Sequence, residues 1–166
     1  MNFSVLLSVY LKEVPGYLDL CLNSINSQKV RPQEVVLVFD GALTDELELV
    51  VANWEDKLPM KIVRLNHNVG LGKALNAGIQ ACSNEWVLRM DTDDVCADDR
   101  FEKQVEFIVK NPGVDLFGSS IIEYDADMKN CLGRRVVPVS HQKITDFAKS
   151  KNPFNHMSVA YKKSKV

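Results

Sequence analysis

Three aspartates directly follow a short apolar segment in the middle of the chain. Residues 86–90 are apolar except for Arg89, and Asp91, Asp93 and Asp94 come next. Where such a segment forms a buried strand, the carboxylates after it gather at the carboxyl edge of the sheet, where α/β proteins hold ligands. Carboxylates this close repel one another unless a cation lies among them, and hard oxygen ligands favour Mg²⁺ or Mn²⁺ over zinc. We therefore predict a metal site among these three residues.

A solvated acidic turn is the alternative interpretation. It gives no reason to place several acids directly after a buried strand, so we do not prefer it for the first three. For Asp98 and Asp99 the ordinary explanation is preferred, because the segment Asp99-Arg100-Phe101-Glu102 is typical of a helix start. An aspartate at that position caps the first turn of a helix.

The composition indicates one domain over residues 1–166. The chain has 46% hydrophobic residues, enough for a sizeable core. Its net charge of −2 and its pI near 5.9 argue against a general nucleic-acid binder, which would carry a basic excess. We expect no nucleic-acid partner.

The four cysteines and the first apolar run bear on the location of the protein. The cysteine spacing fits neither a zinc site nor a small disulfide framework, so we expect reduced thiols in a cytoplasmic protein. Residues 3–10 are too short to cross a bilayer and lack the features of a signal peptide.

The segment 141–166 is basic, with six lysines and a single acid, Asp146. Such a run is usually a solvated face. The alternative is peripheral contact with an anionic membrane surface, at the inner face of the membrane.

Apolar runs alternate with segments of helical spacing along nearly the whole chain. Strands are predicted at residues 5–9, 35–39, 62–65, 86–90, 114–122 and 157–161, and helices at residues 17–25, 43–54, 71–82, 101–109 and 144–149. Residues 123–139 are expected to be irregular or a hairpin. This order predicts the α/β class, with a mostly parallel central sheet flanked by helices.

Polar residues follow the predicted strands at four places: residues 8–13, 40–41, 66–73 and 91–94. Asp40 comes after a buried strand, where its carboxylate can accept a hydrogen bond from a nucleotide base; an ordinary Asp-Gly turn is an equal alternative. The loop 66–73 contains glycines and opens a helix, so backbone N–H groups and Lys73 could meet a diphosphate. It lacks the spacing of a Walker motif or of a dinucleotide fingerprint.

Taken together, these segments resemble the inverting glycosyltransferases of family 2, which have the GT-A fold. The markers are residues 4–10, residues 22–25 with Gln28, Asp40-Gly41, residues 68–78, Met-Asp-Thr-Asp-Asp at 90–94, residues 99–104 and residues 152–159. The last two segments are especially similar to the subgroup that builds bacterial exopolysaccharide and lipopolysaccharide O-units. The resemblance covers nearly the whole chain and implies a GT-A, Rossmann-like nucleotide-binding domain.

The resemblance also assigns roles to individual residues of the nucleotide site. Asp40 would contact the base, with Ser8, Val9 and Tyr10 nearby. Lys73 and Asn76 would lie along the nucleotide-sugar cleft. The family often has Pro where Ser8 stands, Asn where Leu11 stands and Asp where Phe39 stands, and the last of these departures leaves the choice of nucleotide open.

The acidic turn resembles the DxD pair of the family. Asp93 would hold a Mn²⁺ or Mg²⁺ ion that bridges the diphosphate, and Asp91 would face the ribose or the metal. The implied reaction is a single inverting displacement that moves a sugar from a nucleoside-diphosphate sugar, with UDP expected, to a polysaccharide or lipid-linked saccharide. A metal stabilises the leaving group while a carboxylate base deprotonates the acceptor.

No residue of this chain matches that base. We expect the chain to be the donor-binding part of a longer enzyme, without the C-terminal acceptor part and nearly inactive by itself. His156 is either a hydrogen-bonded core residue or a group near the sugar, with equal weight. The edge left by the missing part is expected to be apolar, and self-association is plausible there, around Phe154, Met157, Val159 and Tyr161.

Three other classes of protein compete with a glycosyltransferase. A binding module would hold a nucleotide sugar without turnover. A sugar nucleotidyltransferase would open with a Gly-rich, Arg-containing loop after its first strand, which residues 10–16 do not supply. A receiver-type signalling domain would place its acidic pair after the first strand, and here that pair is absent.

Overall fold

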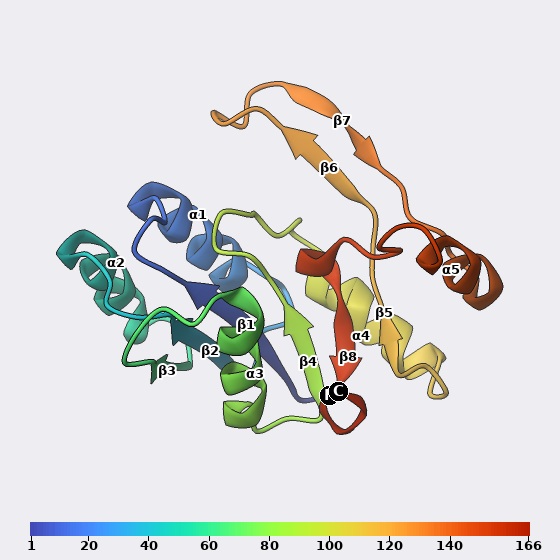
Figure 1. Ribbon diagram of the computed structural model, residues 1–166, viewed down its shortest axis with the longest axis horizontal. Coiled ribbons are helices and arrows are strands. Elements are labelled where there is room, and N and C mark those ends of the chain that lie inside the picture. The colour runs from blue at the N-terminus through green and yellow to red at the C-terminus, as the bar shows by residue number, and fades with distance from the viewer.

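A computed structural model describes all residues, 1–166, as a central sheet between layers of helices (Figure 1). The strands are β1 (Phe3–Val9), β2 (Glu34–Phe39), β3 (Met60–Arg64), β4 (Trp86–Arg89), β5 (Leu116–Phe117), β6 (Ile121–Tyr124), β7 (Cys131–Arg135) and β8 (Ala160–Lys162). The helices are α1 (Pro15–Asn26), α2 (Asp45–Glu55), α3 (Leu71–Ala81), α4 (Arg100–Lys110) and α5 (His141–Ala148), with the short 3₁₀ helices η1 (His156–Ser158) and η2 (Lys163–Lys165).

The main sheet has the strand order β3-β2-β1-β4-β8-β5. The strands β1 to β4 are parallel to their neighbours in this group, and β8 runs antiparallel to both β4 and β5. The central strand β1 is buried on both faces, because Val5 and Leu7 pack into one core cluster and Leu6 packs into the other. The predicted mostly parallel sheet is confirmed, and the carboxyl ends of β1, β2 and β4 lie at one edge.

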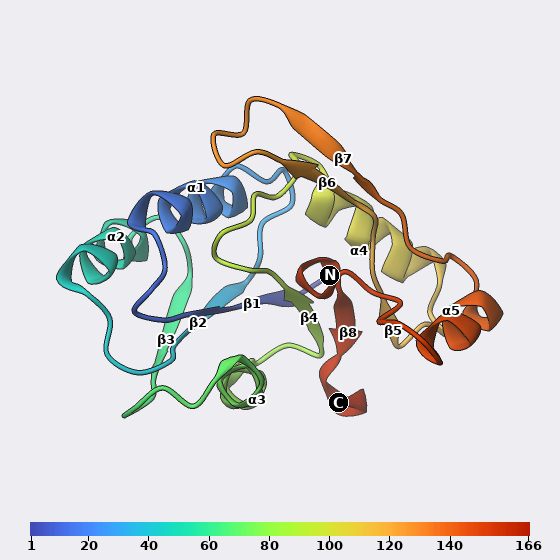
Figure 2. The same cartoon turned by 45° about the horizontal axis from the view of Figure 1, so that its top comes forward.

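Helices cover both faces of this sheet (Figure 2). α1, α2 and α4 bury their apolar sides in the larger cluster, and α3 packs on the opposite face. α3 comes very close to the sheet because residue 78 is glycine. A Cβ added at Gly78 would contact Leu6 Cδ1 and lie 2.7 Å from Val38 Cγ2. The close approach packs α3 directly on β1 and β2.

The apolar segment 114–122 forms two strands instead of the single strand predicted. β5 joins the main sheet, and β6 pairs with β7 in a separate hairpin. The cause is the interruption at residues 118–120. There the carbonyl oxygen of Ser119 accepts hydrogen bonds from Asn155 Nδ2 (2.9 Å) and Ser158 Oγ (3.1 Å), so another segment takes the place of a strand partner.

The predicted strand 157–161 begins later than expected, because residues 156–158 form η1 and β8 starts at Ala160. The proposed apolar edge around this segment was wrong. Val159 and Tyr161 are buried in the smaller core cluster, and Phe154 packs against it, because β8 lies inside the sheet between β4 and β5.

The hairpin predicted as one possibility for residues 123–139 is present as β6 and β7, which extend away from the main sheet (Figure 1). Its apolar side chains are the exposed ones, with Leu132 69% and Val136 68% exposed. None of the helices combines the length and apolarity that crossing a membrane requires.

Candidate functional site

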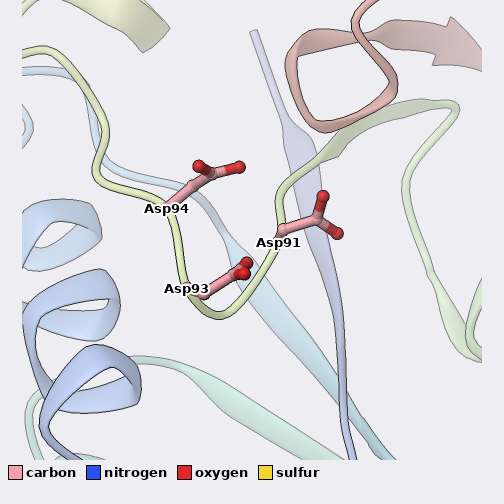
Figure 3. A group of neighbouring side chains, drawn as sticks. All are labelled: Asp91, Asp93 and Asp94. Carbon is pink, nitrogen blue, oxygen red and sulfur yellow. The ribbon is translucent and has the colours of Figure 1, made fainter. Parts of the chain in front are cut away.

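The three aspartates lie together in the turn that follows β4 (Figure 3). One carboxylate oxygen from each of Asp91, Asp93 and Asp94 lies within 4.8 Å of the others. The buried strand fixes where the turn begins, because β4 pairs with β1 over Trp86 to Arg89. The turn is closed by a hydrogen bond from the Asp94 N–H to the Asp91 carbonyl at 3.4 Å.

Asp94 shows that the turn fits a hard cation. Burial, followed by the charges of Asp91 and Asp93, raises the pKa of Asp94 to about 6. Its Oδ2 is buried and has no hydrogen-bond partner. An unpaired buried carboxylate oxygen beside two other carboxylates is unfavourable by itself and is the donor set that Mg²⁺ or Mn²⁺ prefers. Asp93 is exposed beside it and offers a further oxygen.

Asp40 lies at the end of β2 and organises the loop before α3. Its Oδ1 accepts a hydrogen bond from the Val69 N–H at 2.7 Å, and its Oδ2 accepts one from the Gly70 N–H at 3.0 Å. The side chain is buried. Both oxygens are thus already hydrogen-bonded, which the sequence did not indicate. A carboxylate oxygen has a second lone pair, so contact with a base N–H stays a prediction.

Gly41 allows this loop to lie against β2. Its φ is +88°, a conformation that favours glycine, and a Cβ there would lie 2.8 Å from the Asn68 backbone nitrogen. Asn68 Nδ2 in turn donates to the Asp40 carbonyl at 3.2 Å. Asp40 and Gly41 therefore form a turn and also hold the loop at residues 68–70, which is a second segment of the site.

A cleft of about 400 Å³ connects these features. It is lined by Ser8, Tyr10, Glu13, Asp40, Asn68, Gly70, Leu71, Asp91, Thr92, Asp93 and His156. Most of the predicted site residues are therefore brought together here. Glu13 and Thr92 had no predicted role. The Thr92 hydroxyl donates to a Glu13 carboxylate oxygen, which joins the loop after β1 to the acidic turn.

Three residues predicted for the nucleotide site do not line this cleft, and neither does Asp94 of the acidic turn. The Val9 side chain is fully buried in the larger core cluster, and only its carbonyl participates nearby, accepting the Asp40 N–H at 2.8 Å. Lys73 and Asn76 lie exposed on α3, and Asn76 faces a different hollow, shared with Val166. Their assignment to the nucleotide site has no structural contact behind it.

His156 lies in the cleft and not in the core. Its side chain is 52% exposed, and Nδ1 lies 3.5 Å from Asp91 Oδ2. α4 fixes the segment that carries it, since Arg100 Nη2 donates to the Met157 carbonyl (2.9 Å) and Gln104 Nε2 donates to the Ser158 carbonyl (3.1 Å). These two α4 residues belong to the 99–104 marker, and their role is to position η1.

Asp99 occupies the N-cap position of α4, as predicted, but its side chain makes no capping hydrogen bond. The carboxylate forms an ion pair with Lys103 at 2.7 Å instead. The start of α4 is held by Gln28, a buried residue whose Oε1 accepts the Phe101 N–H at 3.1 Å.

The sequence matches the profile described as glycosyl transferase family 2 over residues 4–164. The chain belongs to this family. It is 51% identical over 166 residues to an uncharacterized glycosyltransferase of Haemophilus influenzae, and 48% identical over 164 residues to the amylovoran biosynthesis glycosyltransferase AmsE of Erwinia amylovora. It is 37% identical over 165 residues to an Escherichia coli enzyme named UDP-Gal:alpha-D-GlcNAc-diphosphoundecaprenol beta-1,3-galactosyltransferase.

These alignments cover 99–100% of the chain and 60–62% of the relatives, so the chain spans about three fifths of the length of the curated relatives it matches. Among solved structures it is similar to S. aureus TarS 1–349 in complex with UDP-GlcNAc, with a TM-score of 0.70 and 26% identity, over 99% of this chain and 46% of that one. The Pyrobaculum calidifontis mannosyltransferase PcManGT, in complex with GDP-Man and Mn²⁺, shares the fold with a TM-score of 0.69 at 22% identity, over 97% and 44%. The GT-A fold expected from the sequence is confirmed.

Proposed function

We propose that this chain binds a nucleoside-diphosphate sugar and belongs to an enzyme that transfers the sugar to a saccharide or lipid-linked acceptor. The observation that carries the proposal is the group of three carboxylates at the end of β4, two of which, Asp91 and Asp93, line a cleft that also contains Asp40 and His156. A diphosphate beside so many acids requires a cation between them, and the orphaned oxygen of Asp94 supports one.

UDP is the nucleotide we favour. The E. coli relative is named for a UDP-galactose donor and a diphosphoundecaprenol-linked acceptor, and the TarS structure holds UDP-GlcNAc. AmsE is named for the biosynthesis of an exopolysaccharide, amylovoran. These names support a UDP-sugar donor and an acceptor of a lipid-linked or polysaccharide kind.

We propose the following roles for the residues of the cleft. Asp93 and Asp94 hold Mn²⁺ or Mg²⁺, with Asp91 assisting. When bound, the cation supplies positive charge that stabilises the departing nucleoside diphosphate. Asp40 keeps the loop before α3 in place and contacts the base. The displacement is inverting, and it needs a base for the acceptor hydroxyl, which we assign to no residue of this chain.

His156 is proposed to border the sugar side of the cleft. It is half exposed, it lies beside Asp91, and α4 fixes its backbone, so it can contact a ligand without ordering a mobile segment. The carboxylate beside His156 is that of Asp91, which faces the donor in our proposal.

Calorimetry tests the binding step. We expect UDP to bind in the presence of Mn²⁺, and to bind at least tenfold more weakly after chelation or in Asp93→Ala, because Asp93 would hold a cation whose charge offsets that of the diphosphate. Asp127→Ala is the matched control, since Asp127 is an exposed carboxylate in the β6–β7 turn, paired with Lys129 at 3.4 Å. Equal UDP affinity in wild type, chelated wild type and Asp93→Ala would refute the metal-dependent nucleotide site.

A donor-binding unit without turnover is the second candidate, because we assign none of the residues that line the cleft as the base for the acceptor hydroxyl. Radiolabelled transfer to a lipid-linked saccharide separates the two functions. We expect UDP-sugar binding with slow transfer, because general-base help contributes about a hundredfold to ten-thousandfold in rate. Transfer as fast as by a relative of full length would show that the base lies within residues 1–166.

Peripheral membrane contact is also proposed, on the cytoplasmic side, through α5 and the residues on either side of it. Of the lysines in the basic segment, Lys162 and Lys165 pair with Asp115 at 2.8 Å and 3.7 Å, and Lys149 pairs with Asp146 at 2.8 Å, whereas Lys143 and Lys151 form no ion pair. Exposed apolar side chains lie close to them in sequence, with Val139 91% exposed. We expect sedimentation with anionic vesicles and not with neutral ones; no difference between the two would refute this contact.

A further inference from the structure

Arg89 is a buried cation beside the acidic turn, and no hydrogen bonds offset the burial of its guanidinium. It is the last residue of β4, and its side chain is only 4% exposed. None of its guanidinium nitrogens makes a hydrogen bond. Its single charged partner is Asp91, through a contact between Nη1 and Oδ1. Burying a guanidinium with unused donors costs free energy, so this residue needs a reason beyond the stability of the fold.

The neighbouring Arg100 shows the contrast. Arg100 Nη2 donates to the Arg89 carbonyl at 2.6 Å and to the Met157 carbonyl at 2.9 Å, and its Nε donates to Gln104 Oε1 at 3.2 Å. These hydrogen bonds join β4, η1 and α4, so Arg100 is a structural clamp. Arg89 joins no segments through its side chain. What it contributes is positive charge beside the carboxylates.

The charges that line the cleft make this contribution important. Glu13, Asp40, Asp91 and Asp93 all line it, and His156 is the only basic side chain there. A nucleoside diphosphate is itself an anion. Even with one divalent cation bound, a cleft with this many acids would repel it.

We propose that Arg89 is the internal counter-ion of the cleft. It offsets part of the negative charge of the acidic turn and thereby allows an anionic nucleotide to bind there. It also positions Asp91, because the contact on Oδ1 leaves Oδ2 directed toward His156. The effect that we infer for Arg89 on nucleotide binding rests on the proposed function. Its effect on the binding of a cation to the acidic turn does not depend on that proposal.

The proposal predicts opposite changes for the two ligands. A unit charge about 6 Å from a divalent cation changes the affinity of that cation about tenfold even at the dielectric constant of water, and more at lower values. Arg89→Met keeps most of the apolar stem and removes the charge. We expect Mn²⁺ alone to bind about tenfold more tightly to this variant, and UDP at saturating Mn²⁺ to bind about tenfold more weakly.

The experiment compares wild type, Arg89→Met and Arg89→Lys. Mn²⁺ binding is measured by the electron paramagnetic resonance of free Mn²⁺, and UDP binding by calorimetry at saturating Mn²⁺. Arg89→Lys, which keeps the charge, should restore both affinities to within about threefold of wild type. Lys110→Met is the control, because it removes one positive charge at the far end of α4, where Lys110 pairs with Glu106 at 3.0 Å. It should change neither affinity.

Each outcome decides the proposal. Tighter Mn²⁺ binding with weaker UDP binding supports it, because damage to the structure would weaken both. Unchanged or weaker Mn²⁺ binding in Arg89→Met overturns it. Where Arg89→Met does not fold, Arg89→Gln is measured in its place with the same expectation. A wild type that binds Mn²⁺ but no UDP would refute the proposed function, and the Mn²⁺ measurements would then decide the role of Arg89 alone.

Discussion

Replacing Asp40 with asparagine removes one acceptor from the pair of hydrogen bonds that holds the loop before α3 against the end of β2. The carboxylate accepts from Val69 N–H at 2.7 Å and from Gly70 N–H at 3.0 Å. An asparagine has only one acceptor oxygen, so its NH₂ group must face the other backbone N–H. One hydrogen bond is lost, a buried donor is left unpaired, and the remaining bond no longer has a charged acceptor.

The size of this effect follows from the hydrogen bonds involved. A hydrogen bond to a charged group contributes about 1.5–3 kcal/mol, and a neutral one about 1 kcal/mol. We therefore expect Asp40→Asn to lower the free energy of unfolding by about 3 kcal/mol and Asp40→Ala by about 3–5 kcal/mol. Domains of this kind have about 5–15 kcal/mol of stability, so Asp40→Asn should still fold at 25 °C, and Asp40→Ala should fold if the wild-type stability exceeds about 5 kcal/mol.

Urea denaturation measures these changes, and Asp56→Asn is the control. Asp56 is an exposed carboxylate at the end of α2, and its replacement should alter stability by less than about 0.5 kcal/mol. A loss below about 1 kcal/mol in Asp40→Asn would contradict the structural role of the carboxylate.

Asp40→Ala tests whether Asp40 also contacts the base of the nucleotide. If Asp40 only holds the loop, its loss should weaken the binding of all nucleoside diphosphates by a similar factor. Loss of a contact to a base N–H should weaken UDP more than diphosphates with other bases, without changing the dependence on metal. If Asp40→Ala keeps the wild-type order of affinities for nucleoside diphosphates with different bases, Asp40 does not contact the base and only holds the loop before α3.

Two further predictions concern the packing of α3 and the hydrogen bonds of β2. Gly78→Ala should destabilise the fold by about 1–3 kcal/mol in thermal unfolding, since its Cβ would contact Leu6. Gly72→Ala is the control on the same helix, because its Cβ would meet nothing within 4 Å, and it should be neutral or slightly stabilising. Equal effects of the two substitutions would contradict the packing argument. Burial tends to raise the pKa of Glu34, but hydrogen bonds from the hydroxyl of Ser4 and from Ser83 lower it below its usual value. The stabilisation it gives is therefore complete above the unfolded pKa and is lost as the pH falls through the lower folded pKa. Glu34→Gln should thus cost about 1–2 kcal/mol at pH 7 and progressively less as the pH falls through the folded pKa; a cost independent of pH would contradict this linkage.

The sequence predicted what depends on local pattern. The continuous apolar run 35–39 became β2, and the acids after residue 90 became a cluster at the carboxyl edge of the sheet. Both depend on neighbours in the chain. The run 114–122 was misassigned, because its interruption is caused by Asn155 and Ser158, which lie more than thirty residues away and have no signature in the run itself.

The same limit applies inside the site. Arg89 looked like one polar residue in an apolar strand, and only the three-dimensional arrangement shows that it is buried against Asp91. Asp40 could be placed at a strand end, but its partners are 29 and 30 residues further along the chain. Lys73 was assigned to the site because it follows a glycine-containing loop; it is exposed on α3 and does not line the cleft, so its role stays a prediction.

The segments in and beside the cleft are each held in place by one buried or half-buried polar side chain that binds backbone groups. Asp40 holds the loop before α3, and Arg100 holds η1. Gln28 donates to the Ala97 carbonyl at 2.8 Å and accepts from Phe101 N–H, which fixes the chain between the acidic turn and α4. Backbone groups held in this way need little further ordering when a ligand binds, so more of the interaction energy remains as affinity. The cleft is therefore rigid in its backbone, and the charges of its side chains, Arg89 included, are what distinguish one ligand from another.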